Sequence, residues 1–242
     1  MSDSYRTEEE QVEALKTWWR ENGKSTVVAI AIAVLGVFGW QGWQKQQQAD
    51  QDAASAIYQN LLTAASGDNG QATLAQITTA NHLADTLKAD FTGTTYAHFA
   101  ALYKAKFAVD DNNLDSAAVE LQWVLDSSAT EELRIQARLR LAKVLLAQGQ
   151  LDDAMKLTVA ENMGYDTAFA EVRGDILSAQ GDSAGALAAY QQARDVSATN
   201  LGAQSLLLNL KIQQLENIGQ GDENQSANGE SSASDSADKG DA

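Results

Sequence analysis

The chain has 242 residues, a formal net charge of −16 and neither cysteine nor proline. Without cysteine it can form no disulfide, no thiolate metal site and no thiol nucleophile. Its 33 acidic against 17 basic residues would be repelled by a phosphate backbone, so nucleic-acid binding is disfavoured. The absence of proline, normally about 5% of residues, is typical of an all-helical protein.

The first segment, residues 1–24, contains a predicted helix over residues 8–21. Val12, Leu15 and Trp19 recur on one face of that helix. Glutamates at its start suit the positive end of the helix dipole. An amphipathic helix of this kind can lie on a lipid bilayer. A solvated helix without a partner explains the same pattern.

Residues 25–43 form an uncharged apolar run that has no second example in the chain. A helix of this length covers about 28 Å, close to the ~30 Å hydrocarbon core of a bilayer. Tryptophans flank the run at positions 18, 19, 40 and 43, where aromatic belts are expected. We therefore predict one transmembrane helix. A buried globular helix and a cleaved signal peptide are the alternatives, and the run is long for either.

Basic residues predict the orientation of this helix. Lys16, Arg20 and Lys24 precede it, whereas Lys45 alone follows closely. The positive-inside rule then places the N-terminus in the cytosol and residues 44–242 on the periplasmic side of a bacterial inner membrane.

Small residues mark one face of the predicted span. Ala29, Ala33 and Gly36 fall on that face and would let another membrane helix approach closely. They are a candidate helix-packing face, although small residues are common in spanning helices without partners.

Three stretches of the following segment superimpose without gaps, which predicts an internal repeat. Their offsets of about 37 and 32 residues bracket the 34-residue tetratricopeptide period. Each copy has a small residue in a first helix, a residue that tolerates positive φ, an aspartate near the start of a second helix and a small residue within it. Copy by copy, these residues are Ala105, Asn112, Asp115 and Ala117; Ala142, Gly149, Asp152 and Ala154; and Gly174, Gly181, Asp182 and Ala186.

Further helices are expected on both sides of the repeats. Residues 52–66 and 71–89 predict one helical pair, and 202–218 predicts an amphipathic helix that covers the open end of the stack. The predicted fold is therefore all-α, with one N-terminal transmembrane helix followed by a tetratricopeptide-repeat-like α-solenoid over residues 44–218.

The C-terminal segment, residues 219–242, has no aromatic or branched apolar side chain. It cannot bury enough surface to offset its ordering entropy, so we expect a disordered acidic tail.

The candidate site is a binding surface rather than a catalytic centre. The two histidines, His82 and His98, have no metal-ligand or catalytic spacing, so we expect no enzyme activity, no cofactor and no metal. First helices of such repeats line a groove that can hold a client segment. By repeat position the groove residues are Phe99, Leu102, Lys106, Gln136, Leu139, Lys143, Ala168, Glu171 and Asp175. The Lys/Asn clamp that grips C-terminal carboxylates in some repeat domains is not evident.

Several motifs resemble the YfgM-like ancillary subunits of the bacterial Sec translocon, over residues 8–215. They are Gln11-Val12-Glu13-Ala14-Leu15-Lys16, Trp18-Trp19, Glu21-Asn22-Gly23-Lys24, Gly39-Trp40, Arg173-Gly174-Asp175, Gly181-Asp182 and Leu210-Lys211-Ile212. The acidic tail departs from the family pattern.

The resemblance implies a periplasmic repeat domain that associates with the SecYEG translocon and with a membrane-anchored periplasmic prolyl isomerase. It also implies that the domain hands emerging, unfolded client polypeptides to periplasmic chaperones. The functional hypothesis is a non-enzymatic, membrane-anchored adaptor. The alternative is a structural scaffold of an envelope assembly complex that meets no unfolded client.

Overall fold

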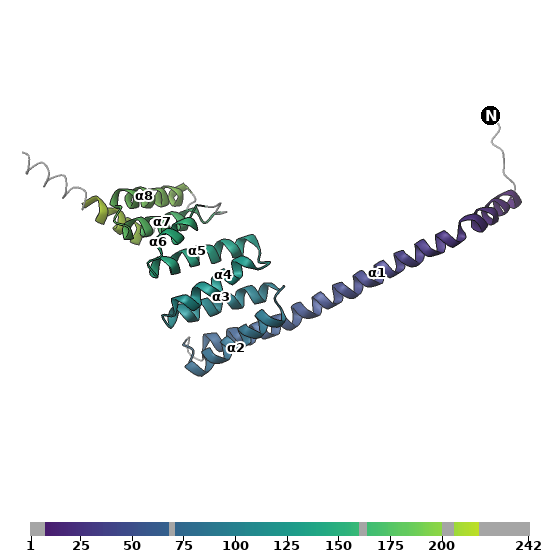
Figure 1. Cartoon of the computed structure of the whole chain (residues 1–242), viewed down its shortest axis with the longest axis horizontal. Coiled ribbons are helices and arrows are strands. Elements are labelled where there is room, and N and C mark those ends of the chain that lie inside the picture. Colours follow the sequence, from purple (N-terminus) through teal and green to yellow (C-terminus); the bar gives the residue numbers. More distant parts are fainter. Residues whose placement is uncertain (1–7, 68–70, 160–163, 200–205, 218–242) are drawn as a thin grey trace, which may run out of the picture. The chain divides into compact units, whose positions relative to one another are not determined.

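A computed structural model describes residues 8–67, 71–159, 164–199 and 206–217 (Figure 1). Within these ranges every regular element is helical, which confirms the all-α prediction. The chain divides into two compact units, Met1–Ser55 and Ala56–Ala242, and each is described separately below. The predicted tail lies outside the described residues.

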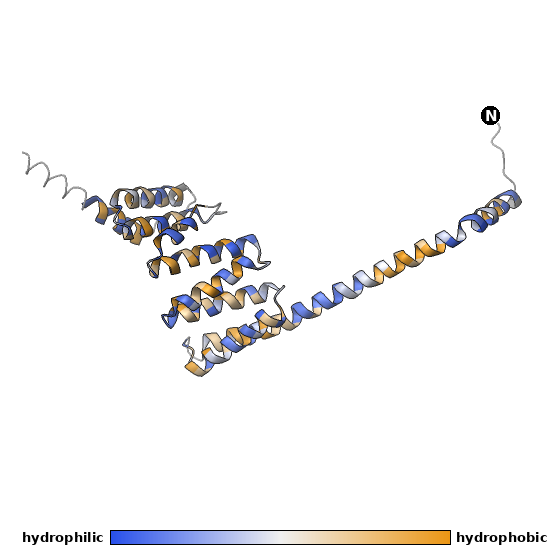
Figure 2. Cartoon of the chain, viewed as in Figure 1, coloured by the Kyte–Doolittle hydropathy of each residue, from blue (hydrophilic) through white to orange (hydrophobic). Residues whose placement is uncertain are grey.

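The first unit holds most of α1, Glu8–Ser66, a helix of 59 residues. α1 lies near the N-terminus of the chain and is long and apolar enough to cross a membrane. None of its apolar 18-residue stretch is buried. Figure 2 shows the apolar stretch between two hydrophilic stretches of the same helix. Trp19 and Trp40 are 21 residues apart, or about 32 Å along the helix, which matches the two interfaces of a bilayer.

Separate helices were expected at 8–21 and 52–66, but both belong to α1. Gly23 does not interrupt the helix, since the Trp19 ring covers it. The hydroxyls of Ser25 and Thr26 donate to the Asn22 carbonyl at 2.8 and 3.0 Å. With no proline in the chain, nothing in this region removes a backbone hydrogen bond.

The second unit contains residues 56–66 of α1, seven further labelled helices and a short helix over residues 206–217. Each labelled helix from α2 onward packs against the next one in sequence, and α5 also packs against α3 and α7. This is the nearest-neighbour packing of a solenoid, and it can be followed in Figure 1. The labelled helices are α2 Leu74–Asp90, α3 Thr95–Asp110, α4 Leu114–Asp126, α5 Glu131–Ala147, α6 Leu151–Lys156, α7 Asp166–Ala179 and α8 Ser183–Thr199.

The three repeated turns have the backbone conformation predicted for them. Asn112, Gly149 and Gly181 have φ of 57°, 76° and 83°. In each turn the next residue donates its N–H to a carbonyl five residues back, at 2.7, 2.9 and 2.9 Å. This is the Schellman closure, which satisfies carbonyls left free at the end of a helix. The three copies therefore end their first helices in the same way.

Most of the labelled helices have a side-chain cap at their N-terminus. Thr73, Thr94, Asn113 and Thr130 each accept the backbone N–H three residues later. Asp182 accepts the Gly185 N–H at 2.8 Å before α8, as predicted. The predicted capping residues of the other copies, Asp115 and Asp152, lie instead in the first turns of α4 and α6, where a carboxylate still suits the helix dipole.

Small residues carry the helix contacts, as the repeat pattern predicts. Ala117, Ala154 and Ala186 are fully buried. The helix over 206–217 closes the last hairpin, because Leu208 and Ile212 join the core formed by Ala170, Ala186, Tyr190 and Ala193 of α7 and α8. The expected end cover is thus present in the described part of the chain.

The second repeat is shorter than the others in its second helix. α6 ends at Lys156 after six residues. Thr158 follows, fully buried, and its carbonyl accepts a hydrogen bond from the Arg173 guanidinium of α7 at 2.9 Å. This carbonyl is therefore satisfied by a side chain rather than by a further helical turn.

Candidate protein-binding groove

A cavity of about 690 Å³ opens between α3, α4 and α5. Its volume lies in the ~300–1,000 Å³ range of ligand pockets. We call it the α3–α5 groove. It is lined by Phe99, Leu102, Tyr103, Ala105, Lys106, Val109, Leu114, Leu121, Gln136, Arg140, Lys143, Val144 and Ala147.

The groove exists because the first helices of two successive hairpins pack side by side. On α3, Phe99 and Tyr103 are four residues apart and Lys106 follows three later, so they share one helix face. On α5, Gln136, Arg140 and Lys143 repeat this spacing. The leucines of α4 complete the lining. Two matching helix faces thus line one cavity.

An aromatic cluster forms the α3 side of the groove. The Tyr58 ring lies 5.4 Å from the Tyr96 ring, 5.8 Å from Phe99 and 6.3 Å from Tyr103, between centroids. Burial, together with the nearby Tyr103 and Tyr96, raises the pKa of Tyr58 to about 12. Tyr58 therefore stays neutral at physiological pH, and it backs the groove-lining rings Phe99 and Tyr103 with apolar surface.

The structure brings five of the nine predicted groove residues together. These five line the α3–α5 groove and are Phe99, Leu102, Lys106, Gln136 and Lys143. Leu139 packs instead against the apolar core that α5 shares with α6 and α7. The role of the five groove-lining residues in binding stays a prediction.

The three remaining predicted residues, Ala168, Glu171 and Asp175, lie on α7 outside the lining of the α3–α5 groove. The Asp175 carboxylate accepts the Tyr190 hydroxyl at 2.7 Å and pairs with the Lys211 ammonium. Asp175 thus links α7 to α8 and to the closing helix. Burial, and then the hydrogen bond to Asp175, raise the pKa of Tyr190.

Sequence reasoning missed Tyr103, Val109 and Arg140, which also line the groove. Helical spacing contained the signal, because Tyr103 follows Phe99 by four residues and Arg140 follows Gln136 by four. Repeat alignment compares equivalent positions and passes over such neighbours.

The motif Arg173-Gly174-Asp175 is a packing motif. Arg173 donates to the Thr158 carbonyl, whereas the Asp175 carboxylate accepts the Tyr190 hydroxyl and pairs with Lys211. A Cβ on Gly174 would lie 2.4 Å from the Tyr190 ring. All three residues therefore hold α7 against its neighbours.

An ion cluster joins α2, α3 and α4 away from the groove. The carboxylate of Glu120, whose side chain is 11% exposed, pairs with Lys88 and, at 3.0 Å, with Lys104. Lys104 also pairs with Asp85, and the Lys88 ammonium lies 4.8 Å from the centroid of the Trp123 ring. Every charge in the cluster has an opposite partner, so it is a structural contact between helices.

His98 is buried and does not line the groove. It is 2% exposed, and its ring lies 5.8 Å from that of Trp123. Neither ring nitrogen has a hydrogen-bond partner, and burial lowers the pKa of this histidine. Within the ranges that the structure describes, no group of three or more His, Asp or Glu side chains is placed to hold a metal ion.

The candidate packing face of the span is open. Ala29, Ala33 and Gly36 are exposed on α1, and a Cβ added at Gly36 would meet no atom within 4 Å. A second helix could approach here, and this role stays a prediction.

Comparison with known proteins identifies a helical-repeat family and several relatives. A family model described as a tetratricopeptide repeat-like domain matches residues 16–217. Proteins named ancillary SecYEG translocon subunit are 34% identical in Escherichia coli (87% of this chain, 98% of the relative) and 34% identical in Haemophilus influenzae (79% and 91%). A relative of the same name in Neisseria gonorrhoeae is 26% identical, over 77% of this chain and 87% of its own length. No solved structure gives a significant match.

The fold and the groove define a helical-repeat protein that has, within its described residues, one helix long and apolar enough to cross a membrane. More specifically, the chain belongs to the ancillary SecYEG translocon subunit family and carries its tetratricopeptide repeat-like domain.

Proposed function

We propose that the chain is a non-enzymatic adaptor of the bacterial inner membrane that associates with the SecYEG translocon. The names of its relatives support the association. The observation that carries the binding role is the α3–α5 groove, a mostly apolar cavity between two repeat helices with no catalytic arrangement in its lining. Such a surface suits recognition of a polypeptide segment.

The proposed topology has residues 1–24 in the cytosol, 25–43 in the membrane and 44–218 in the periplasm. Lys16, Arg20 and Lys24 on one side of the apolar run support it. Anchoring beside the translocon raises the effective concentration of the groove near emerging polypeptides, so weak contacts suffice.

The adaptor would meet further partners in the periplasm. The family resemblance supports a membrane-anchored prolyl isomerase as a neighbour and chaperones as recipients of unfolded clients. Ala29, Ala33 and Gly36 would provide the contact of the span with another membrane helix.

Purification in mild detergent tests the association. We expect SecYEG to co-purify with the full chain. A variant in which residues 26–43 are replaced by an unrelated spanning sequence shows whether the span contributes, and a Phe99→Ala, Leu102→Ala variant does the same for the groove. Recovery of SecYEG no higher than from cells lacking the protein would contradict the proposal.

A client assay separates the adaptor from a scaffold. We expect the detergent-solubilised chain to delay aggregation of an unfolded secretory protein, and the Phe99→Ala, Leu102→Ala variant to delay it less. An inert chain that still co-purifies with SecYEG would favour the scaffold.

A further inference from the structure

The α3–α5 groove has a charge opposite to that of the whole chain. Its lining includes Lys106, Arg140 and Lys143 and no Asp or Glu, although the chain has 33 acidic and 17 basic residues. At physiological salt, charges more than about 8 Å away are largely screened. The charges in the lining therefore decide which segment the groove accepts.

Two of these cations are available to a partner. Arg140 and Lys143 are exposed, and neither forms an ion pair in the part of the chain that the structure describes. Their neighbours four residues away along α5 are Gln136, Leu139, Val144 and Ala147, none of which is acidic. Lys106 differs, since its ammonium pairs with Asp110 at 2.5 Å.

Apart from Gln136 the remaining lining is apolar, and both of its aromatic rings, Phe99 and Tyr103, lie on α3. Phe99, Leu102 and Tyr103 lie on α3, and the two available cations lie on α5. An extended chain directs successive side chains to opposite sides. A segment running between the helices can therefore present apolar side chains to α3 and acidic ones to α5.

We propose that the α3–α5 groove binds an internal, extended polypeptide segment in which aromatic or apolar residues alternate with Asp or Glu. The apolar side chains pack on Phe99 and Tyr103, and the carboxylates pair with Arg140 and Lys143. The inference deepens the proposed adaptor function and rests on it for the source of the segment.

Binding of labelled peptides to the full chain in phosphatidylcholine nanodiscs tests the inference. The probes are eight-residue peptides with acetylated and amidated ends that alternate Phe with Asp or Phe with Lys. We expect the Asp peptide to bind about three- to tenfold more tightly, since two exposed ion pairs contribute modestly. Raising the salt should reduce the difference.

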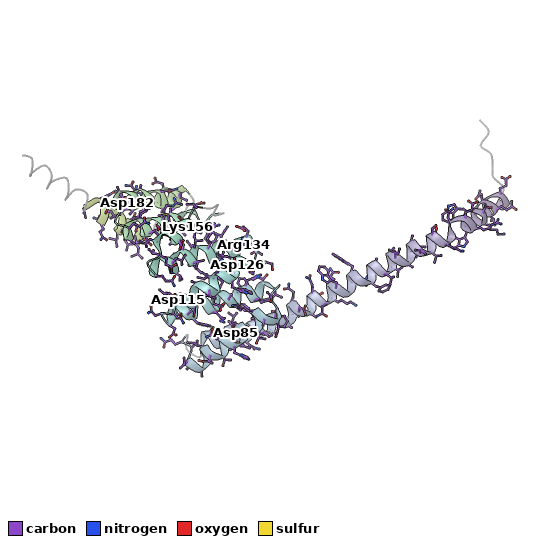
Figure 3. All side chains as sticks on the ribbon, viewed as in Figure 1. Asp85, Asp115, Asp126, Arg134, Lys156 and Asp182 are labelled. Carbon is purple, nitrogen blue, oxygen red and sulfur yellow. The ribbon has the colours of Figure 1, made fainter. Side chains whose placement is uncertain are left out.

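Charge reversal distinguishes the groove from the rest of the surface. The Arg140→Glu, Lys143→Glu variant should prefer the Lys peptide, and a non-specific attraction of the acidic chain for lysine would be equally strong in a control of the same charge. The matched control, Arg134→Glu, Lys156→Glu, changes the formal charge equally at exposed residues outside the lining (Figure 3). These two residues already pair with Glu131 and Asp153. The control should keep the preference for Asp.

Equal binding of the two peptides, or a preference that both double variants change alike, would overturn the inference. So would a result in which the same peptides, made also with a free C-terminal carboxylate, bind only in that form, because the groove would then recognise chain ends. SecYEG co-purification tells the two failures apart. If SecYEG is recovered while the Asp peptide shows no preference, the inference fails alone. If the preference holds without SecYEG, the proposed function fails instead.

Discussion

At the scale of single residues, side chains that were candidates for binding or chemistry turn out to stabilise the fold. Asp175 accepts the Tyr190 hydroxyl and pairs with Lys211, and His98 lies in the core beside Trp123. A sequence shows the type of a residue and its place on a helix. It does not show that Lys211, 36 residues away, will occupy the carboxylate of Asp175.

Gly174→Ala should lower the stability of the repeat domain by about 1–3 kcal/mol. The added Cβ would lie 2.4 Å from the Tyr190 ring, and that ring is held in the core by its hydrogen bond to Asp175. Thermal unfolding of the detergent-solubilised chain measures the change. Gly93→Ala is the control, because its Cβ would meet no atom within 4 Å. Equal effects of the two substitutions would contradict the packing described for Gly174.

His98 should make the domain less stable in mild acid. Burial lowers the pKa of His98 in the folded chain below its unfolded value of about 6.5. The unfolded state then binds the proton more readily, so the free energy of unfolding decreases as the pH falls below about 6.5. Unfolding curves between pH 5 and pH 8 measure this decrease.

His98→Leu should flatten the pH dependence in that range, whereas His82→Leu, at an exposed position, should leave it unchanged. A dependence that survives His98→Leu would assign it to other groups.

At the scale of the elements, much of the solenoid could be predicted because its turns allow few residue types. Asn112, Gly149 and Gly181 occupy positive φ, which few other residues tolerate. The early end of α6 was not predicted, and the partner of the Thr158 carbonyl beyond it, Arg173, lies 15 residues away in the sequence.

The groove was partly predictable for a related reason. Repeat position places Phe99, Lys106, Gln136 and Lys143 on the first helices of two successive hairpins, and all four line the groove. Which α7 residues join such a groove depends on packing between repeats, and repeat position carries no information about that packing.

The closing helix over residues 206–217 should contribute through one face only. Leu208 is 3% exposed and packs in the core of α7 and α8, whereas Leu207 is 69% exposed. We expect Leu208→Ala to lower stability by about 2–4 kcal/mol and Leu207→Ala by less than about 0.5 kcal/mol. Urea unfolding of the two variants compares them. Similar losses from both would mean that this helix does not close the stack.

At the scale of the whole molecule, the proposed function combines an apolar segment of α1 with a helical-repeat unit. The segment is long enough to cross a bilayer, and the groove lies within the second unit. The adaptor role requires these two parts to be in different environments, with the groove where secreted polypeptides emerge.

Labelling of single cysteines in intact spheroplasts tests that requirement most directly, because the natural chain has no cysteine. Thr17→Cys and Ser128→Cys place a thiol at exposed positions on either side of the span. A membrane-impermeant maleimide should label Ser128→Cys at once and Thr17→Cys only after the membrane is permeabilised. Labelling of Thr17→Cys in intact spheroplasts, or protection of Ser128→Cys, would contradict a groove that faces the periplasm.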